Sequence, residues 1–268
     1  MIVVDDGSSS QLDPIVGLFS EKIKLFLLKQ DHAGPAAARN RGVQQAKGEF
    51  IIFTDDDCMA SSDWLTSLVG FLAKKPDSMI GGEILNALPG NLFSSASQAL
   101  VSYLYFYYNK NSRAAHFFTA NNMALSKKCF LAVGGFDQEW GLAAAEDREF
   151  CDRWLFSGYQ MTYAPEAVIY HAHSMSLFGF WDQHFNYGRG AHFFHRTRNC
   201  RNQDPMKIEP LSFYLNLICY PFLRFKKVKA VFISGLMVLA QAANAVGFFW
   251  EQFKSKTVLK INFPGIFL

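Results

Sequence analysis

Apolar and polar positions alternate in short blocks over the first part of the chain. Three apolar runs have the length and composition of buried strands: Ile2–Val4, Ile23–Leu28 and Phe50–Phe53. Helical patterns lie between and after them, beginning at Asp13-Pro14, covering Gly34–Lys47 and running from Trp64 to Leu72. Alternating strands and helices predict an α/β fold with a mostly parallel sheet flanked by helices.

The remainder of the chain changes in character twice. A mixed segment predicts a strand over Phe117–Leu125, a helix over Ala143–Phe156 and a short strand over Ala167–Tyr170. Two hydrophobic helices are then expected, Leu211–Leu223 and Ala230–Trp250. These shifts predict an α/β domain over residues 1–200 and a C-terminal hydrophobic segment over 205–268.

The last of these helices raises the question of a membrane. Ala230–Trp250 has 21 residues without a charge, which is long enough to cross a bilayer. Trp250 lies at one end of the run, where aromatic rings favour the membrane interface. We expect membrane association, and a core helix packed on the α/β domain is the alternative.

Composition removes several classes of protein. Half of the residues are hydrophobic and only 18% are charged, which excludes a disordered chain. The net charge of +3 gives no reason to expect a nucleic-acid partner. The five cysteines are an odd number without CxxC spacing, which disfavours a disulfide framework and a structural zinc site. An enzyme or a binding protein with a substantial core remains.

Acidic clusters follow two of the predicted strands. Asp5 and Asp6 end the first strand, and Asp55, Asp56 and Asp57 end the third. Ligands of open α/β sheets bind at the carboxyl ends of strands. Asp55 and Asp57 can converge on one hard cation that bridges phosphate oxygens, and Asp5 or Asp6 can bind a nucleobase or ribose. Solvated turns are the alternative for both clusters.

Other residues are candidates for binding and catalysis. Arg39 lies on a predicted helix, where it can pair with an anion or remain solvated. Glu146 and Asp147 lie in the first turns of a predicted helix. Either can act as a general base, but the helix dipole alone also favours acidic residues at this position. His171 and His173 alternate at a strand end, where they can ligate a metal or have a structural role.

Taken in order, these motifs resemble those of family 2 glycosyltransferases, inverting enzymes of the Rossmann-related GT-A fold. The resemblance covers roughly residues 1 to 175. It rests on five motifs in sequence, namely Val3–Ser8, Gly34–Gly42, Phe53–Cys58, Gly134–Asp137 and Glu146-Asp147.

The resemblance implies a role for each candidate residue. It implies that Asp147, with Glu146, supplies the catalytic base. It also implies that Asp55, Asp57 and His171 bind Mg²⁺ or Mn²⁺, with His173 as the alternative histidine ligand. It also implies a donor-sugar and acceptor role for Asn121-Asn122 and Gly134–Asp137. The nucleotide-sugar-binding residues that it implies are Asp5, Asp6, Arg39, Asp55 and Asp56.

The family also implies partners and a location. The donor is a nucleotide-diphosphate-sugar, and the acceptor is a saccharide or a lipid-linked hydroxyl used in surface polysaccharide or glycolipid synthesis. Because nucleotide-sugars are made in the cytosol, we expect the cytoplasmic face of the cell membrane.

One departure from the family pattern favours a second hypothesis. Family members usually begin with another strand and helix before the segment that matches Val3–Ser8, so the chain reads as N-terminally truncated. The alternative function is therefore an inactive remnant that binds nucleotide or anchors partners at a membrane. A sugar-phosphate nucleotidylyltransferase is disfavoured, because no Gly-rich, Arg-containing loop lies near the start.

Overall fold

The structure is a computed structural model that describes residues 1–19, 21–139, 144–201 and 209–262, with side chains described as far as residue 255. The chain forms two compact units. The first comprises Met1–Glu83 and Tyr108–Ile169, and the second comprises Ile84–Tyr107 and Tyr170–Leu268. The predicted domain boundary near residue 205 follows composition and stays a prediction.

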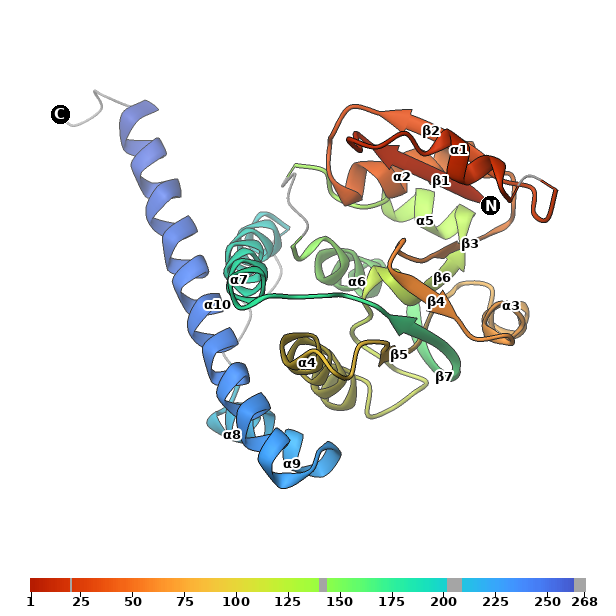
Figure 1. The fold of residues 1–268 in the computed structure, drawn as a ribbon. Coiled ribbons are helices and arrows are strands. Elements are labelled where there is room, and N and C mark those ends of the chain that lie inside the picture. The colour runs from red at the N-terminus through yellow and green to blue at the C-terminus, as the bar shows by residue number, and fades with distance from the viewer. Residues whose placement is uncertain (20, 140–143, 202–208, 263–268) are drawn as a thin grey trace. The chain divides into compact units, whose positions relative to one another are not determined.

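The first unit contains two sheets and the helices that cover them (Figure 1). Its elements are β1 (Ile2–Asp6), α1 (Asp13–Gly17), β2 (Phe26–Gln30), α2 (Pro35–Gln45), β3 (Phe50–Phe53), β4 (Cys58–Ala60), α3 (Trp64–Lys74), the short 3-10 helix η1 (Ala120–Asn122), β6 (Met123–Ser126), α5 (Lys127–Val133) and α6 (Glu146–Phe156). Strands β5 (Ser78–Asn86) and β7 (Gln160–His171) begin in this unit and end in the second.

The sheets confirm an α/β fold and correct the expected strand directions. β1 and β2 form a parallel pair, and α2 packs against β1. The larger sheet has the order β3-β6-β5-β7-β4, in which β6 runs antiparallel to both β3 and β5. β3 and β5 are therefore parallel to each other, as the alternation of strand and helix implies, but a later strand is inserted between them.

Several predicted elements begin or end elsewhere for local reasons. β2 begins at Phe26 rather than Ile23, because the N–H groups of Lys22 and Ile23 both bind the Phe19 carbonyl in a turn. The expected helix Leu211–Leu223 is divided into α8 (Leu211–Cys219) and α9 (Pro221–Arg224), where the proline begins a new helix.

The buried core of the first unit contains Phe53, Phe118, Phe130, Phe136 and Phe150. Phe53, at the end of β3, packs edge-on against Phe136 with ring centroids 5.4 Å apart. Phe136 in turn lies 4.6 Å from Phe150 of α6. Aromatic packing therefore anchors the end of β3, the segment after α5 and the first turns of α6 to one another. The acidic motifs predicted from the sequence follow or lie beside these anchors.

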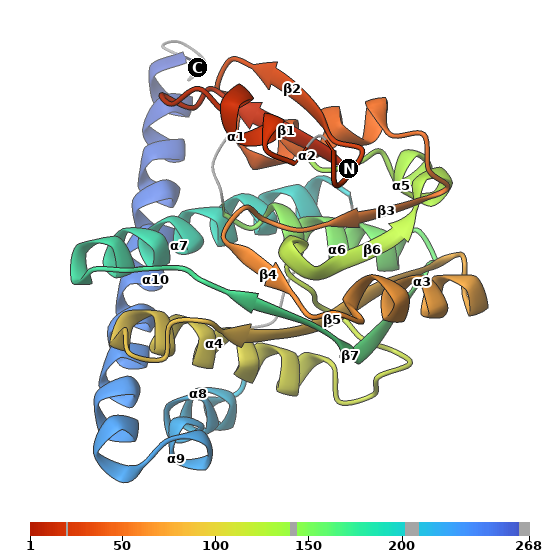
Figure 2. The same cartoon turned by 45° about the vertical axis from the view of Figure 1, so that its right-hand side comes forward.

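The second unit is helical over most of its length (Figures 1 and 2). It contains α4 (Leu92–Tyr108, whose last residue belongs to the first unit), α7 (Leu177–Cys200), α8, α9 and α10 (Lys227–Asn262). Its core joins side chains of α4, α7, α8 and α10, including Tyr103, Phe180, Phe213 and Met237. α10 contains the 230–250 run, and by length and composition alone Lys227–Ser255 is long and apolar enough to cross a membrane.

Candidate active site

Asp6 fastens the end of β1 to the turn that precedes α2. Its Oδ1 accepts hydrogen bonds from Gln30 Nε2 at 2.7 Å and from the Ala33 N–H at 2.9 Å, and its Oδ2 accepts one from the Gly34 N–H at 2.8 Å. Partial burial opposes ionisation of Asp6, but these donors outweigh it and lower its pKa. Asp6 is therefore a carboxylate that shapes the strand end, in addition to its predicted contact with a nucleotide.

Asp5 has a similar local bond. It is buried, and its Oδ1 accepts a hydrogen bond from the Ser8 N–H at 2.8 Å, which lowers the pKa of the carboxyl. Gly7 lies inside this turn with φ +83°, a left-handed conformation that favours glycine. The Asp-Asp-Gly-Ser segment thus forms an ordered turn, and its binding role stays a prediction.

Arg39 joins two acidic motifs that lie far apart in the sequence. Its NH2 donates to Asp55 Oδ1 at 2.9 Å, and its NH1 donates to Glu146 Oε1 at 3.0 Å. The Arg39 side chain is only 15% exposed. Burial opposes its charge, but the two carboxylates outweigh that effect and raise its pKa. The bend after β3 and the start of α6 are therefore held within the reach of one guanidinium group.

Asp147 follows Glu146 in the first turn of α6. It is partly buried, and its Oδ1 accepts a hydrogen bond from the Arg148 N–H at 2.7 Å. Burial and the neighbouring Glu146 charge raise the pKa of Asp147 to about 7, although Arg39 works in the opposite direction. A carboxyl group with this pKa can take up and release a proton near neutral pH, which suits a general base.

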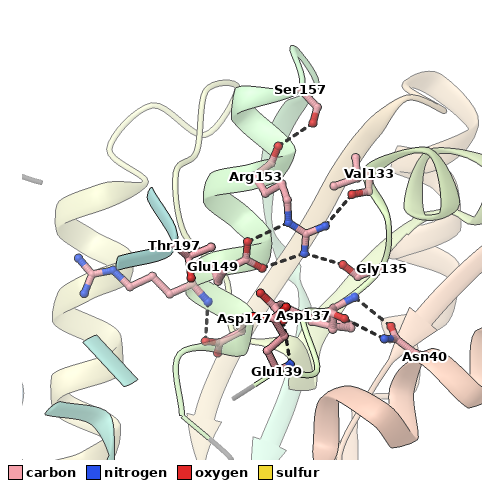
Figure 3. A network of polar contacts seen from close by, with 12 residues as sticks. Asn40, Val133, Gly135, Asp137, Glu139, Asp147, Glu149, Arg153, Ser157 and Thr197 are labelled. Atoms are coloured by element: carbon pink, nitrogen blue, oxygen red, sulfur yellow. Dashed lines mark hydrogen bonds and ion pairs between the residues drawn. The ribbon is translucent and has the colours of Figure 1, made fainter. Parts of the chain in front are cut away.

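A second arginine holds the segment beside this acidic turn (Figure 3). Arg153 donates to Glu149 at 2.8 Å, and also to the carbonyls of Val133 and Gly135, both at 2.6 Å. Asn40 completes the support, because its side chain accepts from the Phe136 N–H at 2.9 Å and donates to the Phe136 carbonyl at 2.8 Å.

The position of the Asn40 side chain explains why residue 135 is a glycine. Gly135 has φ +70°, and a Cβ at this position would lie 2.7 Å from Asn40 Oδ1. Neither the role of Arg153 nor the hydrogen bonds of Asn40 were predicted from the sequence. The i,i+4 spacing of Glu149 and Arg153 was the available signal for that ion pair.

The family model for glycosyl transferase family 2 matches residues 1–134, half of the chain. The chain belongs to glycosyl transferase family 2. The matched part contains the Asp5-Asp6 strand end, Arg39 and the Asp55–Asp57 bend, and the sequence resemblance to this family is confirmed.

Curated relatives of this family-2 chain are glycosyltransferases. Pre-mycofactocin glycosyltransferase of Mycobacterium tuberculosis is 28% identical over 184 residues, which cover 66% of this chain and 38% of that protein. Hyaluronan synthase of Pasteurella multocida is 30% identical over 183 residues, covering 56% of this chain and 19% of the synthase. The chain thus spans well under half of the length of either relative.

Solved structures of glycosyltransferases share the fold of this family-2 chain. Mannosyltransferase PcManGT from Pyrobaculum calidifontis, solved with GDP-Man and Mn²⁺, has a TM-score of 0.56 and 17% identity, covering 97% of this chain and 70% of that one. GalNAc-T7, solved with UDP, GalNAc and Mn²⁺, has a TM-score of 0.52 and 13% identity, covering 98% and 51%. The predicted GT-A-like fold is confirmed.

The Asp55–Asp57 bend offers oxygen ligands of the kind that Mg²⁺ and Mn²⁺ prefer. Asp55 and Asp57 are partly buried, whereas Asp56 is exposed. Asp57 Oδ1 also accepts a weak hydrogen bond from Cys58 Sγ at 3.6 Å, and burial together with the Asp57 charge raises the pKa of that thiol to about 12. Cys58 is therefore a neutral thiol, and the carboxylates are the ligands that fit a hard cation.

The predicted histidine ligands belong to the second unit. His171 is the last residue of β7, and its backbone carbonyl accepts a hydrogen bond from the Ala87 N–H at 2.9 Å. Its ring lies beside that of His173, with centroids 5.4 Å apart. A metal-binding role for His171 stays a prediction.

Asn122, which the resemblance places on the sugar side of the site, has a structural role. It is fully buried, and its Oδ1 accepts a hydrogen bond from Trp64 Nε1 at 2.8 Å. Its Nδ2 donates to the carbonyls of Glu83 and Ala167, both at 2.9 Å. The amide thus connects α3, β5 and β7 across the sheet.

Proposed function

We propose that the chain catalyses transfer of a sugar from a nucleotide-diphosphate-sugar to a hydroxyl acceptor, with inversion at the anomeric carbon and with a divalent metal ion. The observation that carries this proposal is the Arg39 bridge. It holds Asp55 of the acidic bend 2.9 Å away and Glu146, next to Asp147, 3.0 Å away. Groups suited to stabilising a leaving diphosphate and to accepting a proton therefore lie close together.

In this reaction Asp147 acts as the general base. The acceptor hydroxyl loses its proton to a carboxylate oxygen of Asp147 while the acceptor oxygen forms a bond to the anomeric carbon. The bond from that carbon to the diphosphate oxygen breaks, and the electron pair leaves with the nucleoside diphosphate. Because this is one displacement, the configuration inverts and no enzyme nucleophile is needed.

The leaving diphosphate carries negative charge that needs a positive partner. A metal ion bound by Asp55 and Asp57 would supply Lewis-acid stabilisation of the leaving diphosphate. Arg39 keeps Asp55 oriented through its 2.9 Å bond and reduces the repulsion between Asp55 and Glu146. Direct contact of Arg39 with phosphate is a further part of the proposal.

The acceptor that we propose is a saccharide or a lipid-linked hydroxyl at the cytoplasmic face of the cell membrane. The similarity to hyaluronan synthase of Pasteurella multocida supports a saccharide acceptor. The cytosolic origin of nucleotide-sugars supports the location.

Nucleotide binding tests the donor and metal parts of the proposal. UDP and GDP are titrated with and without Mn²⁺, and the melting temperature is recorded for the wild-type chain and Asp57→Ala. We expect Mn²⁺-dependent stabilisation by one of the nucleotides, and its loss in Asp57→Ala. Asp63→Ala, which removes an exposed carboxylate hydrogen-bonded to Ser61, is the matched control and should respond as the wild type does.

Two outcomes of this titration would contradict the proposal. Equal nucleotide stabilisation of Asp57→Ala and wild type would remove the metal role. Absence of any nucleotide or Mn²⁺ effect on the wild type would favour the inactive remnant instead. Where turnover is found, the anomeric configuration of the product measured by NMR tests inversion, and a retained configuration would contradict the single displacement.

A further inference from the structure

Helix α10 presents two apolar faces that have different surroundings. One stripe is fully buried in the core of the second unit and contains Ala230, Ile233, Met237 and Ala240. These positions are three or four residues apart and therefore lie on one side of the helix. The buried stripe packs with α4, α7 and α8 of the same unit.

The opposite side of α10 is exposed and apolar over about seven turns. Every residue on it from position 228 to 253 lacks a polar side chain, a length of roughly 37 Å at 1.5 Å per residue. Helices that face water carry polar residues on their outer side. The large exposed side chains of this stripe are Val228, Val231, Phe232, Val238, Val246, Phe249, Trp250 and Phe253.

The short segment just before α10 also carries exposed apolar side chains, together with basic ones. Phe222 and Leu223 of α9 are 50% and 79% exposed. Arg224, Lys226 and Lys227 are also exposed in the same short segment. The first acidic residue after this segment is Glu251, which is buried and paired with Arg189 at 2.8 Å. Large apolar side chains beside basic residues are typical of a helix that lies in the interface of an anionic membrane.

We propose that α9 and the exposed side of α10 form a platform that lies in the plane of an anionic lipid surface, without crossing the bilayer. A spanning α10 would have to expose its buried stripe to lipid and remove Ile233 and Met237 from the core that they share with Tyr103 and Phe213. In the interfacial arrangement the core stays intact and only the outer stripe enters the lipid. Arg224, Lys226 and Lys227 then face the headgroups.

Binding to lipid vesicles tests the platform. The full chain is mixed with vesicles of phosphatidylcholine, alone or with phosphatidylglycerol, and the bound fraction is measured by flotation. We expect binding that is stronger on the anionic vesicles and weaker at high salt. Lys226→Gln/Lys227→Gln should weaken binding to anionic vesicles by about 25-fold, since each lysine near an anionic surface contributes a factor of about five.

Matched variants separate binding through the platform from non-specific binding to lipid. Phe232→Ser/Phe249→Ser should reduce binding to both kinds of vesicle. Two control variants change exposed residues of the first unit and should leave vesicle binding unchanged. Lys47→Gln/Lys128→Gln matches the loss of two positive charges, and Leu131→Ser/Phe156→Ser matches the loss of two exposed apolar side chains. Equal binding by the platform variants and the control variants would overturn the proposal.

Topology is tested with a C-terminal epitope tag on the full chain. In sealed, everted membrane vesicles from expressing cells, trypsin should remove the tag as fast as it does after detergent opens them. A tag protected until the vesicles are opened would show a spanning α10 and overturn the proposal. A chain that binds no vesicles but forms a dimer dispersed by Phe232→Ser/Phe249→Ser would also overturn it.

Discussion

The raised pKa of Asp147 gives a stability prediction that needs no substrate. The folded chain favours the protonated carboxyl, with a pKa of about 7 against an ordinary value of 3.8. Between these values the folded state binds more protons than the unfolded state, so the free energy of unfolding falls as the pH rises. A pKa shift of about three units corresponds to about 4 kcal/mol in the free energy of unfolding. Because water reaches this partly buried side chain, we expect a smaller effect of about 2 kcal/mol.

Asp147→Asn removes this loss of stability at high pH, because an amide resembles the protonated acid and does not ionise. We expect the variant and the wild type to be equally stable near pH 4, and the variant to be more stable by about 2 kcal/mol near pH 8. Urea unfolding is measured across this range without divalent metal or nucleotide. The difference between the two proteins reports Asp147 together with its interactions with Glu146 and Arg39, because the more distant titrating groups are common to both.

Asp63→Asn is the control for this experiment. Asp63 is exposed at the start of α3 and this variant keeps Asp147, so its free energy of unfolding should change between pH 4 and pH 8 as that of the wild type does. A difference between Asp147→Asn and wild type that is constant with pH, or that shrinks as the pH rises, would refute the proposed environment of Asp147.

Three further substitutions test the supports of the site, each by urea unfolding near neutral pH. Arg39→Ala leaves two partly buried carboxylates without their shared partner and should lower the free energy of unfolding by about 3 kcal/mol. An unchanged urea midpoint would contradict the bridge. Asn122→Ala removes the three hydrogen bonds of a buried amide and should lower the free energy of unfolding by about 3 kcal/mol, so a loss below about 1 kcal/mol would argue against its structural role. Gly135→Ala should cost about 2 kcal/mol because φ is +70° and the new Cβ meets Asn40, and a neutral result would contradict that geometry.

Local sequence patterns predict the places of β1, β2, β3, β6 and β7 in the chain, but they give the observed bounds of β3 alone among these predicted strands. Phe50–Phe53 is a strand with the predicted bounds, because a short buried run followed directly by three aspartates leaves little freedom in where the strand ends. The predicted helix Ala143–Phe156 ends where it was expected, two residues before Gly158 with φ +85°, but it begins later, at Glu146, because Ala145 has a left-handed φ of +72°.

Contacts between distant segments could not be predicted in this way. Arg39 and Glu146 are 107 residues apart, and nothing near either one specifies the other. The antiparallel insertion of β6 between β3 and β5 depends on a long connection, whose direction no local pattern encodes. The role of Asn122 on the sugar side is implied by the family resemblance and stays a prediction. Its hydrogen bonds to Trp64, Glu83 and Ala167 join segments at least 39 residues away and could not be predicted locally.

The most direct test of the proposed function compares sugar transfer by the wild type and Asp147→Asn with a donor that the nucleotide titration identifies. Release of nucleoside diphosphate that requires both Mn²⁺ and an acceptor is measured near pH 8, where the Asp147 carboxylate is ionised. We expect the variant to bind the nucleotide as the wild type does but to lose at least about 100-fold in turnover. Wild-type turnover by Asp147→Asn would contradict the assignment of the general base.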